Sequence, residues 1–252
     1  DTVLSVQGLC KHYPGFALKN VSFSLAPQRI MGLIGKNGAG KSTTLKLMLN
    51  MAALEGGSVS IFQKDFHQHE KECKQRMGVV FGGIDFYPLK KLSAITAVTR
   101  KFYRDWDQSQ YERYLRQFAL DEGKRFKELS NGLKIKYLLA LALSHHAELL
   151  ILDEPTSGLD PVSREELLHI FQQIVKRETC SILFSTHITS DLDRCADDIT
   201  YIHEGRVLES ADKETFLRAF DHLKTEKDGE ALTLEEIMLR TERSSWDDND
   251  SI

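Results

Sequence analysis

Long hydrophobic runs are absent from this 252-residue sequence. No apolar run approaches the about 18 residues that a membrane-spanning helix requires, so we expect a chain that does not cross a bilayer. The first residues, Asp-Thr-Val-Leu-Ser-Val, have neither the basic start nor the long apolar core of a signal peptide, and they include no Met. We therefore predict no signal peptide.

Cysteine is scarce, and its four copies lie far apart in the sequence. They are Cys10, Cys73, Cys180 and Cys195. No close pair of cysteines and no Cys/His spacing typical of a zinc site occurs, so we expect reduced thiols, as in the cytosol. The histidines His145 and His146 are adjacent and would leave a helix in different directions, which predicts a surface or packing role.

A strong excess of charge of either sign is also lacking. The formal net charge is −4 and the pI about 6.2, with 28% charged and 41% hydrophobic residues. This balance is typical of a soluble globular protein. It disfavours a protein that coats the phosphates of nucleic acid, so we expect no nucleic-acid partner. The length suits one large domain, or a domain with an inserted lobe.

The chain does contain an alternation of apolar strands and amphipathic helices. Apolar runs predict strands within 2–34, most clearly at 21–25 and 30–34, and at 59–62, 77–81, 149–152 and 181–185. Apolar spacings of three and four predict helices at 41–49, 163–177 and 188–195, and a helical segment from about 84 to 147. This order indicates an α/β fold interrupted by a helical lobe. The polar, acidic end at 244–252 is expected to fray.

The segment Gly35-Lys-Asn-Gly-Ala-Gly-Lys41-Ser42, here called the phosphate loop, fits the pattern G-x-x-x-x-G-K-[ST]. Its glycines let backbone N–H groups turn toward phosphates, and the following helix points its positive end at them. Lys41 supplies a charge for the β and γ phosphates, and the Ser42 hydroxyl suits a Mg²⁺ shell. With this composition the pattern is expected about 0.01 times by chance. The loop therefore predicts nucleotide binding.

Two acidic residues follow a buried strand. Leu149-Leu-Ile-Leu-Asp153-Glu154 places two carboxylates at the carboxyl edge of the sheet, where α/β proteins bind ligands. Asp153 is predicted to hold Mg²⁺, directly or through water, and Glu154 to orient and deprotonate the attacking water. By itself, a strand that ends in an acidic residue is moderate evidence for these roles. Together with the phosphate loop it predicts an ATPase.

With these motifs the sequence resembles the ATP-binding-cassette (ABC) ATPases over about residues 3–220. Leu129-Ser-Asn-Gly-Leu133 is similar to the family's signature loop, with Asn131 in place of the first Gly and Leu133 in place of the final Gln. Ser157-Gly-Leu-Asp160 is similar to the D-loop, and His187 matches the switch histidine. Tyr13 stands where the family stacks an aromatic ring on adenine.

The resemblance implies an α/β fold with a P-loop NTPase core of ABC type, an inserted α-helical lobe and an antiparallel β-subdomain. It implies a nucleotide-binding domain at 1–220, with the lobe at about 84–147, and a C-terminal extension at 221–252. ATP contacts are expected from Tyr13, Gly35, Lys36, Asn37, Gly38, Ala39, Gly40, Lys41, Ser42, Thr43, Ser130, Gly132 and Asp160. Mg²⁺ is expected at Ser42 and Asp153, and catalysis at Glu154 and His187.

The family's architecture also implies partners. Ser130 and Gly132 would contact the γ-phosphate on an opposite subunit, so the active unit would be a head-to-tail dimer with two ATP molecules sandwiched between an identical or a related cassette. Separate transmembrane permease subunits would hold the chain at the cytoplasmic face of the membrane. Residues 82–91, with Phe86, Tyr87, Leu89 and Leu92, would receive the permease, or simply pack the lobe.

One position departs from the family. Gly82 stands where the family usually has a Gln that reaches Mg²⁺ and the catalytic water, and Gly83 follows it. Neither glycine has a side chain that can replace that amide, so we expect slow basal hydrolysis by the isolated chain and a membrane partner that orders this loop. A water or Asp85 would substitute for the amide, or Asp85 is an ordinary solvated acid of the loop.

The segment 101–107 and the tail 232–238 are similar to a bacterial exporter branch of bacitracin and acetoin type, which favours the ATPase subunit of an exporter. The alternatives are a soluble ABC ATPase that remodels a protein or nucleic-acid assembly, and a nucleotide-binding regulator without turnover.

Overall fold

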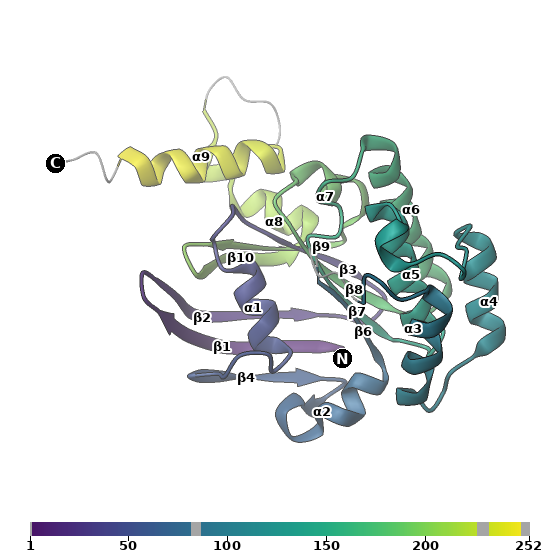
Figure 1. Ribbon diagram of the computed structural model, residues 1–252. Coiled ribbons are helices and arrows are strands. Elements are labelled where there is room, and N and C mark those ends of the chain that lie inside the picture. The colour runs from purple at the N-terminus through teal and green to yellow at the C-terminus, as the bar shows by residue number, and fades with distance from the viewer. Residues whose placement is uncertain (1, 82–86, 226–231, 248–252) are drawn as a thin grey trace.

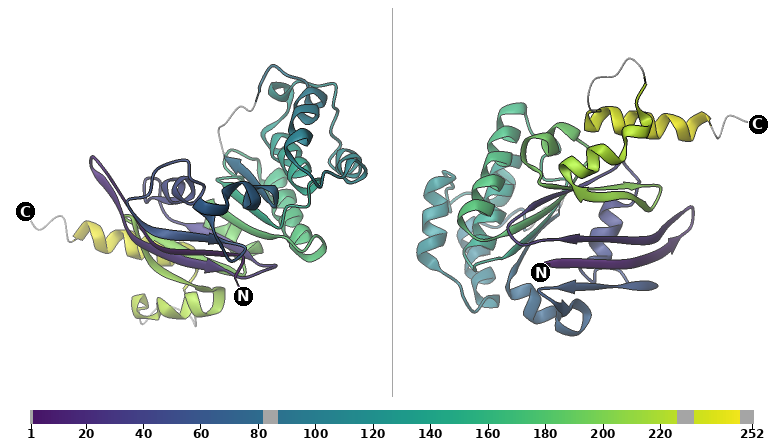
Figure 2. Two further views of the ribbon diagram at one scale, coloured as in Figure 1. Left: turned by 90° about the horizontal axis from the view of Figure 1, so that it is seen from below. Right: turned by 180° about the vertical axis from the view of Figure 1, so that it is seen from behind.

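The computed structural model describes residues 2–81, 87–225 and 232–247. Two β-sheets lie beside each other, and a group of helices extends from one of them (Figures 1 and 2). The smaller sheet is antiparallel, with strand order β2-β1-β4-β5, and it confirms the expected β-subdomain. Its strands are β1 (Leu4–Tyr13), β2 (Phe16–Leu25), β4 (Gly56–Ile61) and β5 (Lys64–Asp65).

The larger sheet has six strands in the order β10-β9-β3-β8-β7-β6, all parallel except β10. Its central strands are apolar and buried on both faces, which explains their continuous hydrophobic runs. The strands are β3 (Ile30–Ile34), β6 (Met77–Phe81), β7 (Leu149–Asp153), β8 (Ser181–Thr186), β9 (Asp198–His203) and β10 (Arg206–Asp212).

Alternate residues of these strands enter two separate cores. Leu149 and Ile151 pack with α1 (Lys41–Met48) and the β-subdomain, whereas Leu150 and Leu152 pack with the helices on the other face. Those helices include α5 (Asn131–Leu143), α6 (Pro161–Arg177) and α7 (Thr189–Cys195). α1 and α5 therefore cover opposite faces of the six-stranded sheet.

The predicted helical lobe is present. It consists of α3 (Leu92–Thr99), η1 (Arg100–Phe102), α4 (Gln108–Gln117), η2 (Phe126–Glu128) and α5. Two buried tyrosines, Tyr111 and Tyr137, bring their hydroxyls within 2.7 and 2.9 Å of Thr96 Oγ1. Burial raises the pKa of both phenols, so they remain neutral hydrogen-bonding groups. These buried hydrogen bonds thus join α3, α4 and α5 inside the apolar core of the lobe.

The helix at residues 66–75 was not predicted. α2 (Phe66–Gln75) begins directly after the short β5, and the Asp65 side chain caps it by accepting from the Gln68 N–H at 2.9 Å. Its sequence is mostly polar, and of its residues Phe66 and Cys73 are buried. Two buried residues are too few to give a clear apolar period in the sequence.

The chain ends in α8 (Lys213–Ala219), η3 (Asp221–Leu223) and α9 (Leu234–Asp247). The expectation of fraying from residue 244 is wrong as far as Asp247, because α9 continues to that residue. Leu234 and Ile237 are buried in the larger core, and an anchored helix adds one backbone hydrogen bond for each further residue. The division at residue 220 remains a prediction.

The remaining expectations concern single residues. The four cysteines are free, and His145 is buried with its ring stacked on Tyr103 at 3.6 Å between centroids. Burial lowers the pKa of His145 to about 4, so its ring is neutral, and it packs as expected. His146 is exposed. Within the described ranges no helix combines the length and the apolar character needed to span a membrane.

Gly205 provides a test of the contact between the two sheets. It has φ +75°, and an added Cβ would lie 1.9 Å from the Ala17 carbonyl oxygen. Gly15 has a similar φ of +80°, but a Cβ there meets no described atom within 4 Å. We expect Gly15→Ala to lower the free energy of unfolding by about 1 kcal/mol. Gly205→Ala should lower it by about 3 kcal/mol or more, because strain and overpacking add.

Urea denaturation of both variants measures the difference. Equal losses for the two alanines would contradict the close approach of the β9–β10 turn to β2.

Candidate functional site

The phosphate loop connects β3 to α1, as its pattern predicts. Gly38 and Gly40 have φ values of +84° and +116°, in the region that favours glycine. An added Cβ on Gly40 would also lie 2.7 Å from Leu18 and 2.9 Å from Phe16. The first N–H groups of α1 have no partner inside the helix, so they point out of its N-terminus as donors for an anion.

Lys41 is buried at the start of α1, with 5% of its side chain exposed. Its ammonium donates to the carbonyl oxygens of Gly35 at 2.7 Å and Lys36 at 3.3 Å, and lies 3.2 Å from Glu154 Oε1. A buried ammonium needs such partners, because an unpaired charge inside a protein is costly. These contacts hold the charge at the centre of the phosphate loop.

Asp153 lies where β7 ends, beside the start of α1. Its Oδ1 accepts hydrogen bonds from Ser42 Oγ at 3.1 Å and from Ser185 Oγ at 2.5 Å. The parallel register pairs Asp153 with Ser185, which places both side chains on the face covered by α1. Ser185 was missed by the sequence reasoning. Its position two residues before His187, at the end of a buried strand, is the signal that identifies it.

Glu154 follows at the next position and adopts a left-handed φ of +50°. Its N–H donates to Ser185 Oγ at 2.9 Å, and its Oε2 lies 2.8 Å from His187 Nδ1. Its other carboxylate oxygen is the one close to Lys41. A strained backbone that several contacts hold in place is typical of functional sites. Three strand ends thus bring together the predicted Lys41, Ser42, Asp153, Glu154 and His187.

The donor set fits a magnesium-bound triphosphate. Ser42 and Asp153 offer oxygen atoms at one point, and Mg²⁺ takes such oxygens together with those of substrate phosphates. In the part of the chain that the structure describes, no cluster of three or more His, Cys, Asp or Glu residues suits a metal ion.

Other residues that are predicted to contact ATP differ in their surroundings. Ala39 is buried and its carbonyl oxygen accepts from the Gly205 N–H at 3.0 Å. The ammonium of Lys36 lies 2.6 Å from Glu242 Oε2, so this side chain is paired with α9. Asn37 is exposed and Thr43 is half-buried on α1. Their predicted contacts with ATP remain predictions.

The signature-like residues lie elsewhere. Ser130 caps α5 by accepting from the Leu133 N–H at 3.3 Å, and Gly132 lies in the first turn of that helix. Because α5 and α1 cover opposite faces of the sheet, one chain does not bring Ser130 and Gly132 to its own phosphate loop. An added Cβ on Gly158 would lie 3.8 Å from Asn131 Nδ2, so the signature-like and D-loop-like segments adjoin.

Asp160 and Tyr13 are also outside the strand-end cluster. The carboxylate of Asp160 caps α6, accepting from the N–H groups of Val162 and Ser163 and from Ser163 Oγ. The Ser163 hydroxyl, followed by these backbone groups, lowers the pKa of Asp160, which stays ionised. Tyr13 is 42% exposed at the end of β1, with Lys11 Nζ 5.6 Å from its ring centroid. An exposed ring at this position remains available for stacking.

The predictions for Gly82, Gly83, Asp85 and Phe86 fall outside the described residues. Phe81, the last described residue before them, pairs with Asp153 in the parallel register. The Asp153 carboxylate therefore adjoins the strand that leads into this segment.

The phosphate loop, two strand-end carboxylates and a histidine at one sheet edge define a P-loop ATPase. The ABC transporter family model matches residues 18–157, more than half of the chain. The chain belongs to the ABC transporter family of ATP-binding subunits. It is 30% identical over 89% of its length to the bacitracin transport ATP-binding protein BcrA of Bacillus licheniformis, covering 72% of that protein.

Further comparisons agree on the fold and differ in the direction of transport that their names give. A Nod factor export ATP-binding protein I of Burkholderia orbicola is 33% identical over 75% of this chain and 64% of that protein. The solved structure of an ATP-binding subunit of an ABC transporter has a TM-score of 0.81 at 27% identity, with 94% of this chain and 98% of that chain covered. A methionine import ATP-binding protein of Acinetobacter baylyi is 29% identical over 77% of this chain and 57% of that protein. ATP hydrolysis is common to the family, whereas the direction of transport is not.

Lys41 gives the direct test of the phosphate loop. We expect Lys41→Ala to reduce ATP hydrolysis at least a hundredfold, because a charge-assisted contact to the phosphates is lost. Lys46 lies on the same helix and is exposed, so Lys46→Ala is the matched control and should hydrolyse ATP within twofold of the wild type. Steady-state phosphate release measures both. Near-normal hydrolysis by Lys41→Ala would contradict the site.

Proposed function

We propose that this chain is the ATP-hydrolysing subunit of a membrane exporter whose membrane-spanning subunits are separate chains. The observation that carries the ATPase role is the contact of Glu154 with both Lys41 and His187 beside the phosphate loop. The relative named for Nod factor export supports the exporter class. The relative named for methionine import makes an importer subunit the competing function.

Each residue of the site has a role in this proposal. Lys41 and the N–H groups of α1 bind the β and γ phosphates, and Tyr13 stacks on the adenine. Ser42 and Asp153 would hold Mg²⁺, which would supply positive charge beside the phosphates. Glu154 accepts the proton of the attacking water, and His187 orients Glu154 through the 2.8 Å contact. Ser185 fixes Asp153 and the backbone of Glu154.

A second cassette completes the site in this proposal. Ser130, Gly132 and Asp160 lie at or near the N-termini of α5 and α6, where backbone N–H groups attract an anion. These helices lie on the face opposite α1, so their N-termini serve the nucleotide of another chain. Two chains in a head-to-tail arrangement then enclose two ATP molecules.

Glu154→Gln tests hydrolysis and assembly together. The amide keeps the shape of the side chain but removes the base, so ATP is expected to stay bound and to hold two chains together. Light scattering with saturating Mg-ATP should show a dimer for Glu154→Gln and a monomer for the double variant with Lys41→Ala. A Glu154→Gln protein that remains monomeric would contradict pairing of identical cassettes. A dimer formed only with a related cassette chain would then identify a heterodimer.

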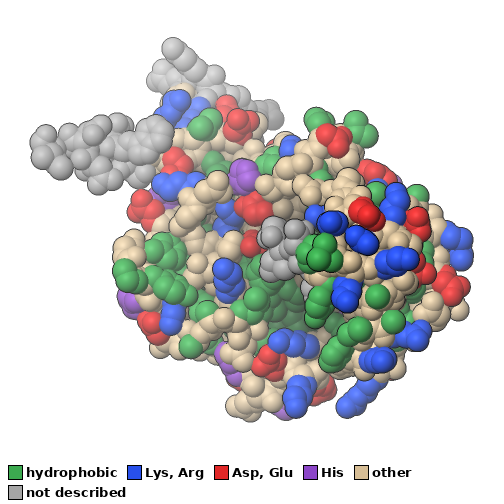
Figure 3. Space-filling model, in the orientation of Figure 1, with side chains coloured by type: hydrophobic (Ala, Val, Ile, Leu, Met, Phe, Trp, Pro, Cys, Tyr) green, Lys and Arg blue, Asp and Glu red, His purple; other side chains and the backbone are tan. Residues whose placement is uncertain are grey.

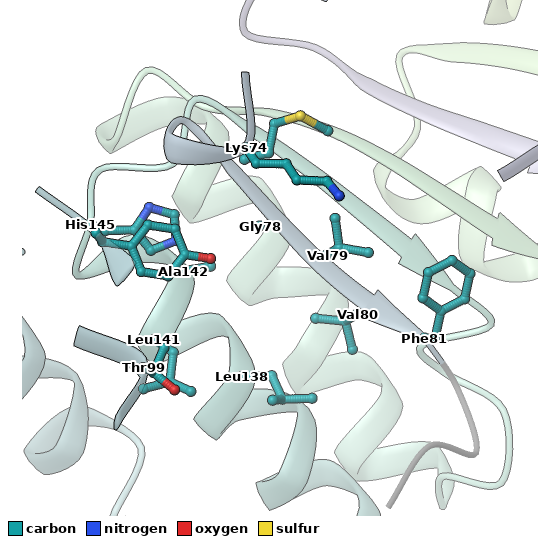
Figure 4. A pocket seen from close by; sticks show the side chains of 12 residues that line it. Lys74, Gly78, Val79, Val80, Phe81, Thr99, Leu138, Leu141, Ala142 and His145 are labelled. Atoms are coloured by element: carbon teal, nitrogen blue, oxygen red, sulfur yellow. The ribbon is translucent and has the colours of Figure 1, made fainter. Parts of the chain in front are cut away.

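A groove beside β6 is the proposed contact for the permease. A pocket of about 390 Å³ lies between β6 and the helical lobe. Val79 and Phe81 line it from β6, and Leu138 and Ala142 line it from α5 (Figure 4). Hydrophobic side chains gather in a hollow beside the lobe in Figure 3. A short apolar helix from a membrane subunit suits such a groove. The permease would hold the chain at the cytoplasmic face of the membrane.

The residues expected to line this contact divide into two groups. Leu92 is fully buried in the lobe, so the packing interpretation is right for it. Tyr87 and Leu89 are 58% and 65% exposed, in keeping with a contact surface. The pocket itself is lined by β6, α5 and the segment around Thr99 and Tyr103, which were not named from the sequence.

Val79→Asp tests the groove. Val79 is 39% exposed, so a carboxylate there should leave folding and the ATPase activity of the isolated chain within twofold. It should reduce co-purification with the permease at least tenfold, because a charge enters an apolar contact. Leu208→Asp is the control, since Leu208 is similarly exposed on β10 at the opposite edge of the sheet. Equal permease binding by the two variants would contradict this docking site.

A further inference from the structure

The C-terminal helix α9 reaches the phosphate loop through one carboxylate. Glu242 Oε2 lies 2.6 Å from the ammonium of Lys36, and Oε1 lies 2.9 Å from His203 Nδ1. The Tyr201 hydroxyl donates to Oε1 at 3.5 Å. Only 13% of the Glu242 side chain is exposed. A residue 206 positions after Lys36 thus makes an ion pair with the phosphate loop, in which the Glu242 side chain is enclosed and the Lys36 side chain is 43% exposed.

Packing holds α9 in the place that this contact needs. Leu234 and Ile237 are buried in the same core as Phe216 and Phe220. Arg240 Nη1 donates to the Leu223 carbonyl oxygen at 2.7 Å, which ties the helix to η3. α9 also packs against α7 (Figure 1), and α7 begins two residues after His187. The helix therefore lies between the phosphate loop and the segment that follows the histidine.

The end of β9 and the turn after it also contact the phosphate loop. The Gly205 N–H donates to the Ala39 carbonyl oxygen at 3.0 Å. An added Cβ on Gly35 would lie 2.3 Å from the Ile202 carbonyl oxygen, so the two backbones are in close contact. Glu242 joins this strand end, through His203, to Lys36. The loop thus contacts both the β9–β10 turn and α9.

The negative charge of Glu242 favours its contact with Lys36. Burial raises the pKa of Glu242, but the hydrogen bonds from Lys36 and His203 outweigh burial, and the net pKa is lowered. The carboxylate is therefore ionised at neutral pH and faces the Lys36 ammonium. Glu242 is the enclosed member of the pair, so removing the Lys36 ammonium takes a cation from a shielded carboxylate, whereas the 43% exposed Lys36 side chain is reached by solvent.

We propose that Glu242 is a positioning residue that holds the phosphate loop in its nucleotide-binding shape, and that docking of α9 and binding of ATP stabilise each other. The proposal rests on the ATP site described above. Because thermodynamic coupling is reciprocal, a helix that strengthens ATP binding must itself be strengthened by ATP. The C-terminal extension then acts on nucleotide affinity without touching the nucleotide.

Glu242→Gln in the full 252-residue chain is the test. The amide keeps the shape of the side chain and removes its charge. We expect the Kd for Mg-ATP, measured by calorimetry, and the KM to rise about fivefold. The kcat should stay within twofold of the wild type, because Glu242 affects nucleotide binding and not the hydrolysis step. Glu235→Gln removes the same charge from an exposed position of α9 and should leave Kd and KM unchanged.

A double-mutant cycle separates positioning from a general loss of stability. Lys36→Met removes the other half of the pair, so Glu242→Gln should weaken ATP binding less than twofold in that background. A full fivefold effect there would overturn the proposal, because the effect would not pass through Lys36. Equal Kd values for wild type and Glu242→Gln would also overturn it.

Hydrogen exchange on the wild-type chain tests the coupling between α9 docking and ATP binding even if Glu242→Gln does not fold. Saturating Mg-ATP should slow amide exchange in residues 234–243 at least twofold, and unchanged exchange overturns the coupling. Lys41→Ala with ATP is the control and should show no slowing. Failure of the wild-type chain to bind ATP would instead refute the ATP site, which separates the two failures.

Discussion

The parallel alignment of β3, β8 and β7 is the constraint on which the rest of the structure depends. Their register places Ile34, Thr186 and Asp153 at the same edge of the sheet, so the residues that follow each strand meet there. The phosphate loop follows β3, Glu154 follows β7 and His187 follows β8. Without this register, the ammonium, the carboxylates and the imidazole would have no common centre.

The alternation of side chains along these strands also separates two kinds of site residue. Asp153 and Ser185 are on the face covered by α1, so they meet Ser42. The helices on the other face carry Ser130 and Asp160 at their N-caps. One chain thus presents a phosphate loop and, separately, two helix N-termini. This division gives a physical reason for the proposed dimer, in which the helix N-termini of one chain face the phosphate loop of the other.

Support for the phosphate loop comes from parts of the chain that are distant in sequence. The β9–β10 turn bonds to Ala39, and α9 reaches Lys36 through Glu242. A loop rich in glycine is costly to order, since glycine has much conformational freedom to lose. Contacts from several elements reduce that cost at the moment of binding. In the proposed coupling they also make nucleotide affinity sensitive to the C-terminal extension.

The sequence by itself determined the local motifs, because each depends on residues close together in the chain. The glycines of the phosphate loop, the acids after Leu152 and the apolar period of the lobe are all local signals. The tertiary structure alone decided which of these meet. Ser185 joins Asp153, and Glu242 joins Lys36, through strand register and helix packing over long separations. Such contacts depend on how whole strands and helices pack together, and a short sequence pattern does not determine that packing.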